Sequence, residues 1–481
     1  MIVYWFGFFF ILLMLISGFL GYFKTKTVDD FVIGGRNVGP WLSAFAYGTT
    51  YFSAVLFIGY AGKIGYSFGL KSLWIAIGNA VLGSFIAWKV LAKKTREMTE
   101  KLNARTMPEF LSARYNCKLY KYISALIIFI FLVPYSASVY MGLSYFFESL
   151  FKISYINALL LIACLTTIYL ILGGYSAVAL ADFIQGLIMI LGVFFMVYYL
   201  TSNPAIGGIA NVKDKLAGID ESYINVWGGK GFNSIIFLTL LTSLGTWGMP
   251  QMVQKFYAIK DSNSIKPATY ISSAFALIIA GGAYLTGAMT PIFFKTVPMD
   301  PVLMKPNPDL IIPQLLSTYV PEWVTALIFL LVLSASMSTL SSLVLVSSSA
   351  VTIDFLGDIG ILKNNKLQIV FLRILSLVFI FLSVYIAVRK TTIILSLMAT
   401  SWGAVSGAFL APYIYGLFSK RVNVYGAFAG TITGLSITVI FSIIYKFDPA
   451  KLPYISVMSM ILPLLVVPLV SMFFKENQKI E

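Results

Sequence analysis

The chain has 481 residues, of which 59% are hydrophobic and only 11% are charged, and its formal net charge is +15. In soluble domains about a quarter of the residues are charged, so this composition excludes a soluble protein. Histidine is absent, which excludes histidine metal ligands, His-containing catalytic triads and imidazole proton relays, and the basic residues form no stripe that would bind nucleic acid.

Apolar runs of about 20 residues, the length with which an α-helix crosses a bilayer, recur along the whole chain. We predict an all-α membrane protein with about 13 transmembrane helices, at residues 2–23, 40–63, 70–91, 122–147, 154–172, 176–200, 231–258, 267–293, 323–351, 367–388, 391–416, 423–445 and 452–474. Segment 1–23 has no positively charged start and no small-residue cleavage site, so we expect a retained N-terminal helix. No connection is long enough for a soluble domain, and residues 1–481 are expected to form a single domain.

An odd number of spans places the two termini on opposite sides of the membrane. Lysine and arginine are enriched in the cytoplasmic connections of membrane proteins. In this chain they are densest between Lys93 and Lys121. This distribution predicts a multi-pass protein of the cell (cytoplasmic) membrane, with its N-terminus outside and its C-terminus inside.

Two predicted spans are interrupted by small and polar residues, GTTYFS at 48–53 and GTWGMP at 245–250. They begin the segments 40–200 and 231–416, which contain five predicted spans each, so the second segment crosses the membrane in the inverted sense. Interrupted helices at equivalent positions of inverted repeats are typical of a transporter's binding site, although glycine also serves close helix packing. We therefore predict a solute site from residues that flank the breaks, which are Tyr51, Ser53, Leu56, Thr242, Thr246, Trp247 and Gln251.

Hydroxyl groups and one carboxylate lie inside otherwise apolar spans. Ser338, Ser341 and Ser342 share one face of a helix and offer the oxygen ligands that small hard cations prefer, or else they bond the preceding carbonyls. Asp182 lies well inside the sixth predicted span, where an acid pairs with a basic residue or marks an ion path. Few basic residues lie inside the spans, mainly Lys89 and Arg373, so the pattern favours a transported cation at Asp182.

Five motifs together resemble the sodium/solute symporter family of bacteria and archaea. They are DDFVIGGRNVGPW at 29–41, FIGYAGKIGYSFGL at 57–70, ARTMPEFLSARY at 104–115, GGYSAVALADFIQG at 173–186 and SMSTLSS at 336–342. The resemblance runs from about residue 1 to 420. It implies the leucine-transporter fold, with two inverted five-helix repeats at 40–200 and 231–416, one extra N-terminal helix at 1–23 and two C-terminal helices within 423–474.

The resemblance also implies sodium as a cofactor, with one or two ions, and no organic cofactor. Sodium site 1 would consist of the carbonyls of Thr49, Phe52 and Ala335 and the hydroxyls of Ser338 and Thr339. Sodium site 2, which only some members have, would consist of Asp182, Ser338, Ser341 and Ser342.

The family pattern does not name the solute. Proline carriers have an acidic residue where this chain has Tyr51, and a tryptophan and a tyrosine where it has Thr242 and Thr246. The glutamine of the sugar carriers is matched by Leu56.

The resemblance implies a secondary active symporter that couples inward sodium flow to the uptake of an amino acid, a carboxylate, a sugar or a vitamin by alternating access. Two alternatives stay open, which are a membrane sensor or regulator built on a transporter fold and a passive channel. An enzyme is not expected. The expected partners are the small-molecule solute and the lipid bilayer, with no nucleic acid and no obligate protein partner.

Overall fold

The computed structural model describes residues 2–24, 27–172, 175–229, 231–300, 304–362, 364–390 and 392–474. These residues form helices and connections and contain no β-strand, so the predicted all-α class is confirmed. Met1, where the predicted N-terminal helix starts, and the two glycines that begin the motif GGYSAVALADFIQG lie outside the described residues.

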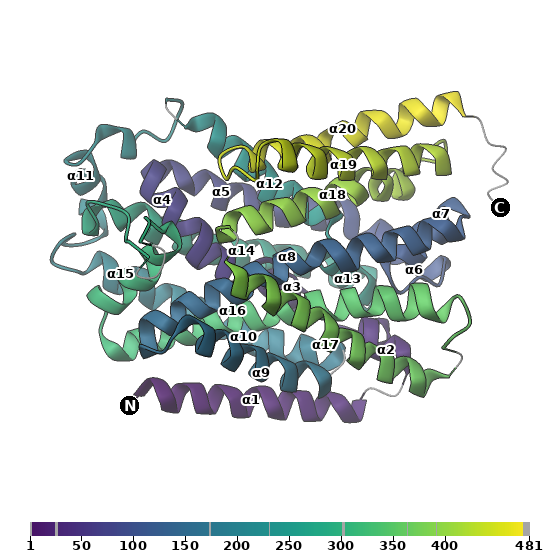
Figure 1. Ribbon diagram of the computed structural model, residues 1–481, viewed down its shortest axis with the longest axis horizontal. Helices are drawn as coiled ribbons and strands as arrows, with labels where there is room; N and C mark the ends of the chain where they lie inside the picture. Colours follow the sequence, from purple (N-terminus) through teal and green to yellow (C-terminus); the bar gives the residue numbers. More distant parts are fainter. Residues whose placement is uncertain are drawn as a thin grey trace.

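Long helices make up the body of the molecule (Figure 1). They are α1 (Ile2–Lys24), α8 (Lys118–Phe151), α9 (Tyr155–Leu172), α10 (Tyr175–Thr201), α12 (Phe232–Gly248), α14 (Ile265–Phe293), α16 (Glu322–Ser349), α17 (Asn365–Arg389), α18 (Ile394–Phe418), α19 (Val424–Ile444) and α20 (Leu452–Phe473).

Shorter helices cap and connect them or continue a bent span. They are α2 (Val28–Ile33), η1 (Gly34–Arg36), α3 (Pro40–Tyr51), η2 (Val55–Ala61), α4 (Gly62–Phe68), η3 (Gly69–Ser72), α5 (Leu73–Gly78), η4 (Asn79–Ile86), η5 (Trp88–Ala92), α6 (Lys93–Lys101), α7 (Met107–Tyr115), η6 (Ile209–Asn211), α11 (Val212–Ala217), η7 (Glu221–Tyr223), α13 (Pro250–Ala258), η8 (Ser262–Ser264), η9 (Pro308–Leu310), α15 (Ile311–Tyr319) and η10 (Ala350–Gly357).

In the described part of the chain, nine helical stretches are long and apolar enough to cross a membrane, and the bent pair α12–α13 makes a tenth. One of the nine runs from Pro40 to Lys101, through both the second and the third predicted spans. The chain is thus a multi-pass helical membrane protein, while the number of 13 spans stays a prediction. The start of α1 and the end of α20 lie at opposite ends of the bundle (Figure 1).

Both helix breaks that the sequence predicts are present. α3 ends at Tyr51, and Phe52 is extended, with φ −114° and ψ 127°, before the helix resumes as η2. At the second break, the ring of Pro250 disfavours the α conformation of the residue before it. Met249 is accordingly extended, with φ −81° and ψ 119°, and α12 and α13 meet at a bend of 48°.

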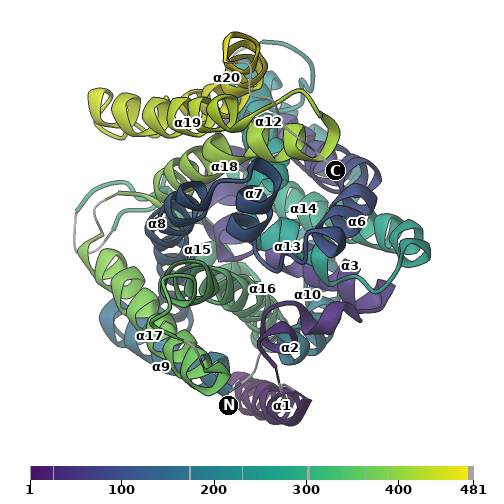
Figure 2. The same cartoon turned by 90° about the vertical axis from the view of Figure 1, so that its right-hand side faces the viewer.

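The core of the bundle surrounds the first break. α16 is buried along almost its whole length, and it packs against α3, α8 and α10. Figure 2 shows α3, α10, α13, α14 and α16 together at the centre of the molecule, with α1 on one side and α19 and α20 on the other. This packing places the broken helices beside α16, which contains Ser338, Ser341 and Ser342.

Candidate functional site

The first helix break lies against the middle of α16. The hydroxyl of Ser338 donates a hydrogen bond to the carbonyl of Thr49 at 2.9 Å, and the hydroxyl of Thr339 lies 3.5 Å from the carbonyl oxygen of Phe52. Both hydroxyls also lie at 2.9 and 3.0 Å from the carbonyl oxygen of Ala335. Each residue predicted for sodium site 1 therefore lies within hydrogen-bonding distance of at least one other member of the site.

These oxygens are shielded from water and lipid, since none of the side chains of Thr49, Phe52, Ala335, Ser338 and Thr339 is more than 2% exposed. Carbonyl and hydroxyl oxygens are the ligands of hard cations. The cluster offers such ligands from the broken helix and from α16, two elements far apart in the sequence. Its chemistry fits a small monovalent cation, and its assignment to sodium remains a prediction.

Sodium site 2 lies beside this cluster, and a lysine that the sequence analysis did not consider reaches it. Lys255 of α13 donates a hydrogen bond from Nζ to the hydroxyl of Ser342 at 3.0 Å, and Nζ lies 3.9 Å from Oδ2 of Asp182. The expectation that Lys89 and Arg373 are the main basic residues inside the spans is wrong, because the fully buried Asp182 faces an equally buried ammonium.

The remaining members of sodium site 2 bond to the protein. The hydroxyl of Ser341 donates to the carbonyl of Ser338 at 2.8 Å, and the hydroxyls of Ser342 and Thr50 are 2.9 Å apart. Neither carboxylate oxygen of Asp182 accepts a hydrogen bond from the described residues. The only positive charge that the structure describes beside this carboxylate is the ammonium of Lys255.

Gly186, the last residue of the motif GGYSAVALADFIQG, explains how α10 brings Asp182 close to the break. A Cβ atom at this position would lie 2.3 Å from the ring of Phe45 on α3, a distance that no side chain tolerates. Glycine therefore permits the close packing of α10 on α3. Asp182, one helical turn before it, is buried between these elements and α16.

A small cavity lies next to the first break. Aromatic and neutral polar residues line it, which are Tyr51, Phe52, Ser53, Val55, Leu56, Tyr60, Asn79, Tyr135, Thr242, Tyr284, Met398 and Trp402. We call it the solute cavity. No charged side chain is among these lining residues. The hydroxyls of Tyr60 and Tyr284 and Nε1 of Trp402 are buried without a hydrogen-bond partner among the described residues.

Of the residues predicted to bind the solute, Tyr51, Ser53, Leu56 and Thr242 line this cavity. The hydroxyl of Tyr51 donates to the carbonyl of Thr242 at 2.7 Å and so joins the two broken helices.

Thr246, Trp247 and Gln251 are not among the lining residues. Thr246 donates to the carbonyls of Gly83 and Ser243 at 3.1 and 2.8 Å. The indole of Trp247 donates to the carbonyl of Leu82 at 3.0 Å. Gln251 is buried on α13, 1% exposed.

The sequence analysis missed the lining residues that lie outside the two breaks. They come from η2, η4, α8, α14 and α18, and they are Tyr60, Asn79, Tyr135, Tyr284, Met398 and Trp402. Asn79 was the most detectable of them, because it is an amide inside an apolar run, and its Oδ1 accepts hydrogen bonds from Thr242 and Ser243.

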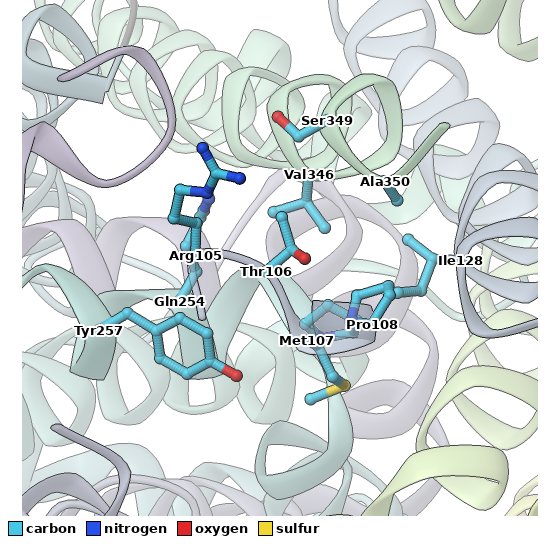
Figure 3. Close-up of a pocket in the computed structure, with 11 residues that line it drawn as sticks. Arg105, Thr106, Met107, Pro108, Ile128, Gln254, Tyr257, Val346, Ser349 and Ala350 are labelled. Carbon is cyan, nitrogen blue, oxygen red and sulfur yellow. The ribbon is translucent and has the colours of Figure 1, made fainter. Parts of the chain in front are cut away.

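A second cavity is lined by Gln254 and Tyr257 of α13, which lie on either side of Lys255, and by Val346 and Ser349 of α16, which follow Ser342 (Figure 3). We call it the end cavity. Its polar lining includes Thr106, Gln254, Tyr257 and Ser349. The hydroxyls of Tyr257 and Ser349 and Oε1 of Gln254 have no hydrogen-bond partner among the described residues.

Arg105, which lines the end cavity, forms two ion pairs. Arg105 pairs with Asp29 at 3.2 Å and with Glu109 at 2.7 Å, and so links α2 to α7. The hydroxyl of Thr106 donates to Asp354 of η10 at 2.9 Å. These contacts close the bundle at the end where α20 finishes (Figure 1).

The family model and the relatives that follow are all solute transporters. The model of the family described as "Sodium:solute symporter family" matches residues 31–434. The chain is 32% identical to the sodium/proline symporter of Salmonella typhimurium over 433 residues, which cover 89% of this chain and 85% of that protein. It is 30% identical to the osmoregulated proline transporter of Bacillus subtilis, with 90% and 87% of the two chains covered.

Solved structures show a shared fold. A substrate-bound, outward-open Na+-coupled sialic acid symporter superposes with a TM-score of 0.79 and 18% identity over 99% of both chains. A nucleobase-cation-symport-1 family transporter gives a TM-score of 0.53 at 13% identity, with 93% of this chain and 96% of that one covered.

Proposed function

The chain belongs to the sodium:solute symporter family and works as a sodium-coupled secondary transporter, and from this premise we propose how it binds its ion and its solute. One sodium ion binds at sodium site 1, and a compact solute of zero net charge binds in the solute cavity. The observation that carries this proposal is the position of Phe52. Its carbonyl oxygen lies 3.5 Å from the hydroxyl of Thr339, within the cluster proposed as sodium site 1, while the residue also lines the solute cavity.

Shared use of Phe52 gives the coupling a physical basis. A sodium ion on the carbonyls of Thr49 and Phe52 would fix the backbone of the break, and the same backbone forms one wall of the solute cavity. Each ligand then lowers the free energy with which the other binds. Coupling free energies of this kind amount to about 1–3 kcal/mol.

The cavity lining supports a solute without net charge. A net charge would be buried among aromatic rings and neutral polar groups with no opposite charge to pair with. The unpaired donors of Tyr60, Tyr284 and Trp402 suit acceptor groups of a solute. A zwitterionic amino acid also fits, because the break offers the negative end of α3 and the positive end of η2 side by side.

Proline is the first solute to test, since it is named for the relatives in Salmonella typhimurium and Bacillus subtilis. It is compact, zwitterionic and largely apolar. The lack of an acidic side chain in this cavity leaves the solute's ammonium group to carbonyls and aromatic rings, so other small amino acids are included in the proposal.

We further propose that the transporter alternates between outward-open and inward-open states. Residues 40–200 and 231–416 act as the two inverted repeats of 13 spans, residues 1–23 and 423–474 supply the extra helices, and the N-terminus lies outside. In this arrangement the end cavity is the inner release route, and its unpaired oxygens receive the departing ion. Opening requires that Arg105 separates from Asp29.

A thermal-shift screen of the purified protein in detergent tests the proposed solute class. Proline, other amino acids, carboxylates, sugars and vitamins are added with and without sodium, because a ligand stabilises the state that it binds. We expect stabilisation by a neutral or zwitterionic solute that is larger when sodium is present. A response to an anionic solute alone, independent of sodium, would contradict the proposal.

Two conservative variants test the solute cavity. Tyr60→Phe and Tyr284→Phe each remove a hydroxyl that has no partner within the described chain, so neither should destabilise the fold. Loss of a hydrogen bond to the solute costs about 0.5–1.5 kcal/mol, so solute affinity should fall by about two- to tenfold in at least one of them. Titration of the solute into each variant measures this change, while sodium affinity without solute should stay as in the wild type.

Tyr140→Phe is the matched control for these variants. Tyr140 is also fully buried, but its hydroxyl bonds to Thr166 between α8 and α9, away from the solute cavity. Its solute affinity should equal that of the wild type. Unchanged affinity in both Tyr60→Phe and Tyr284→Phe would show that the solute binds elsewhere.

A further inference from the structure

The ammonium of Lys255 lies among the groups that the family pattern offers to a second sodium ion. Its Nζ donates to Ser342 at 3.0 Å and lies 3.9 Å from Asp182. The ring of Tyr175 on α10 lies with its centroid 5.0 Å from the same nitrogen. The exposed fractions of Lys255 and Asp182 are only 1% and 0%, so neither charge reaches water.

Charge balance decides what else can bind there. A buried, ionised carboxylate is costly without a positive partner, and one ammonium already lies beside Asp182. A sodium ion added beside Lys255 would leave one uncompensated positive charge in a buried site. Lys255 and a sodium ion are therefore alternative partners of Asp182, and the lysine has the advantage that it is attached to the chain.

No ammonium or other charged side chain lies within hydrogen-bonding distance of the hydroxyls of sodium site 1 among the described residues. The ligands of this site are carbonyls and hydroxyls. The two neighbouring sites thus differ in one respect that matters for ion binding. One is a neutral set of oxygens, and the other is already neutralised by an ammonium.

We propose that Lys255 is a tethered cation that takes the place of a second sodium ion, so that the protein moves one sodium ion per transport cycle. Lys255 belongs to the broken span α12–α13, whereas Asp182 and Ser342 belong to α10 and α16. The ammonium therefore joins these elements in every cycle without leaving the protein. This inference rests on the proposed function only in taking sodium site 1 as the remaining ion site.

Sodium binding to the full-length protein in detergent, measured with radioactive sodium at equilibrium, tests the proposal. The wild type should bind one ion with a Hill coefficient near one. Lys255→Met removes the ammonium, retains an unbranched side chain of similar length and leaves the Asp182 carboxylate free for sodium. This variant should bind two ions, and its Hill coefficient should rise above one.

Lys89→Met is the matched control, because Lys89 is an exposed lysine on η5 near the ring of Phe85. It should bind one ion, like the wild type. Two ions bound to the wild type would overturn the proposal without touching the proposed function, whereas no sodium bound to the wild type would overturn the proposed function. If Lys255→Met folds only when sodium is present, the result supports the proposal, because sodium then replaces the ammonium. If Lys255→Met folds and binds only one sodium ion, the proposal is overturned.

Discussion

Asp182→Asn is expected to destabilise the protein by about 3–5 kcal/mol, because it removes one partner of a buried ion pair and leaves the other charge unpaired. Asp182 and Lys255 lie 3.9 Å apart, and both are buried in the core around α16. Asparagine has nearly the same shape as aspartate, so the loss reflects charge and not volume. The yield of monodisperse protein and its thermal unfolding in detergent measure the effect.

The double variant Asp182→Asn/Lys255→Met is the control for this prediction. It removes both charges, and a neutral pair of similar volume is often as stable as the buried ion pair that it replaces. Most of the lost stability should therefore return. If Asp182→Asn were as stable as the wild type and only lowered sodium cooperativity, Asp182 would be a sodium ligand and not the partner of Lys255.

Thr339→Ala is expected to lower the apparent sodium affinity at least tenfold, which corresponds to about 1.4 kcal/mol. The hydroxyl of Thr339 lies within 3.5 Å of the carbonyl oxygens of Thr49, Thr50 and Phe52. It sits in a buried cluster, so water does not take its place without cost. The sodium dependence of solute uptake in proteoliposomes measures the loss.

Two variants on the same helix serve as controls. Thr339→Ser keeps the hydroxyl and should retain most of the sodium affinity. Ser347→Ala removes a buried hydroxyl of α16 that has no partner among the described residues, and its affinity should equal that of the wild type. Equal sodium affinities of Thr339→Ala and the wild type would exclude Thr339 from the ion site.

The helix breaks could be predicted because their causes are local. Pro250 restricts Met249 directly, and the small and polar residues from Gly48 to Ser53 mark the interruption of an apolar span next to Phe52. The proximity of α16 to the first break was expected from the resemblance, because SMSTLSS and the broken helix are recognisable motifs, whereas sodium binding there stays a prediction. In each case the information lies within a short stretch of sequence.

The partner of Asp182 could not be predicted in the same way. Lys255 is 73 positions away along the chain, and the sequence analysis placed it after the second predicted break without considering it as a partner of Asp182. The bend of 48° at Met249 turns α13 so that Lys255 reaches Ser342. Only the three-dimensional packing brings this charge to Asp182.

The solute cavity was predictable in part for a similar reason. Residues that flank a break share a neighbourhood, and Tyr51 and Thr242 do line the cavity. Whether another residue near a break reaches the cavity depends on the face of the helix on which it lies. The indole of Trp247 does not line the cavity and donates a hydrogen bond to the carbonyl of Leu82 on η4. Trp402 and Tyr284 come from α18 and α14, whose sequences carry no sign of a binding site.

Solute uptake into proteoliposomes under an imposed sodium gradient tests the central claim most directly. Labelled proline, or the solute that the thermal-shift screen identifies, is supplied outside with sodium while the interior contains potassium. Transfer of one net charge gains about 2.3 kcal/mol per 100 mV, so an inside-negative potential should enhance uptake of a neutral solute. We expect accumulation that needs external sodium, grows with this potential and vanishes when the gradient is dissipated; equal accumulation under a proton gradient without sodium would contradict the account.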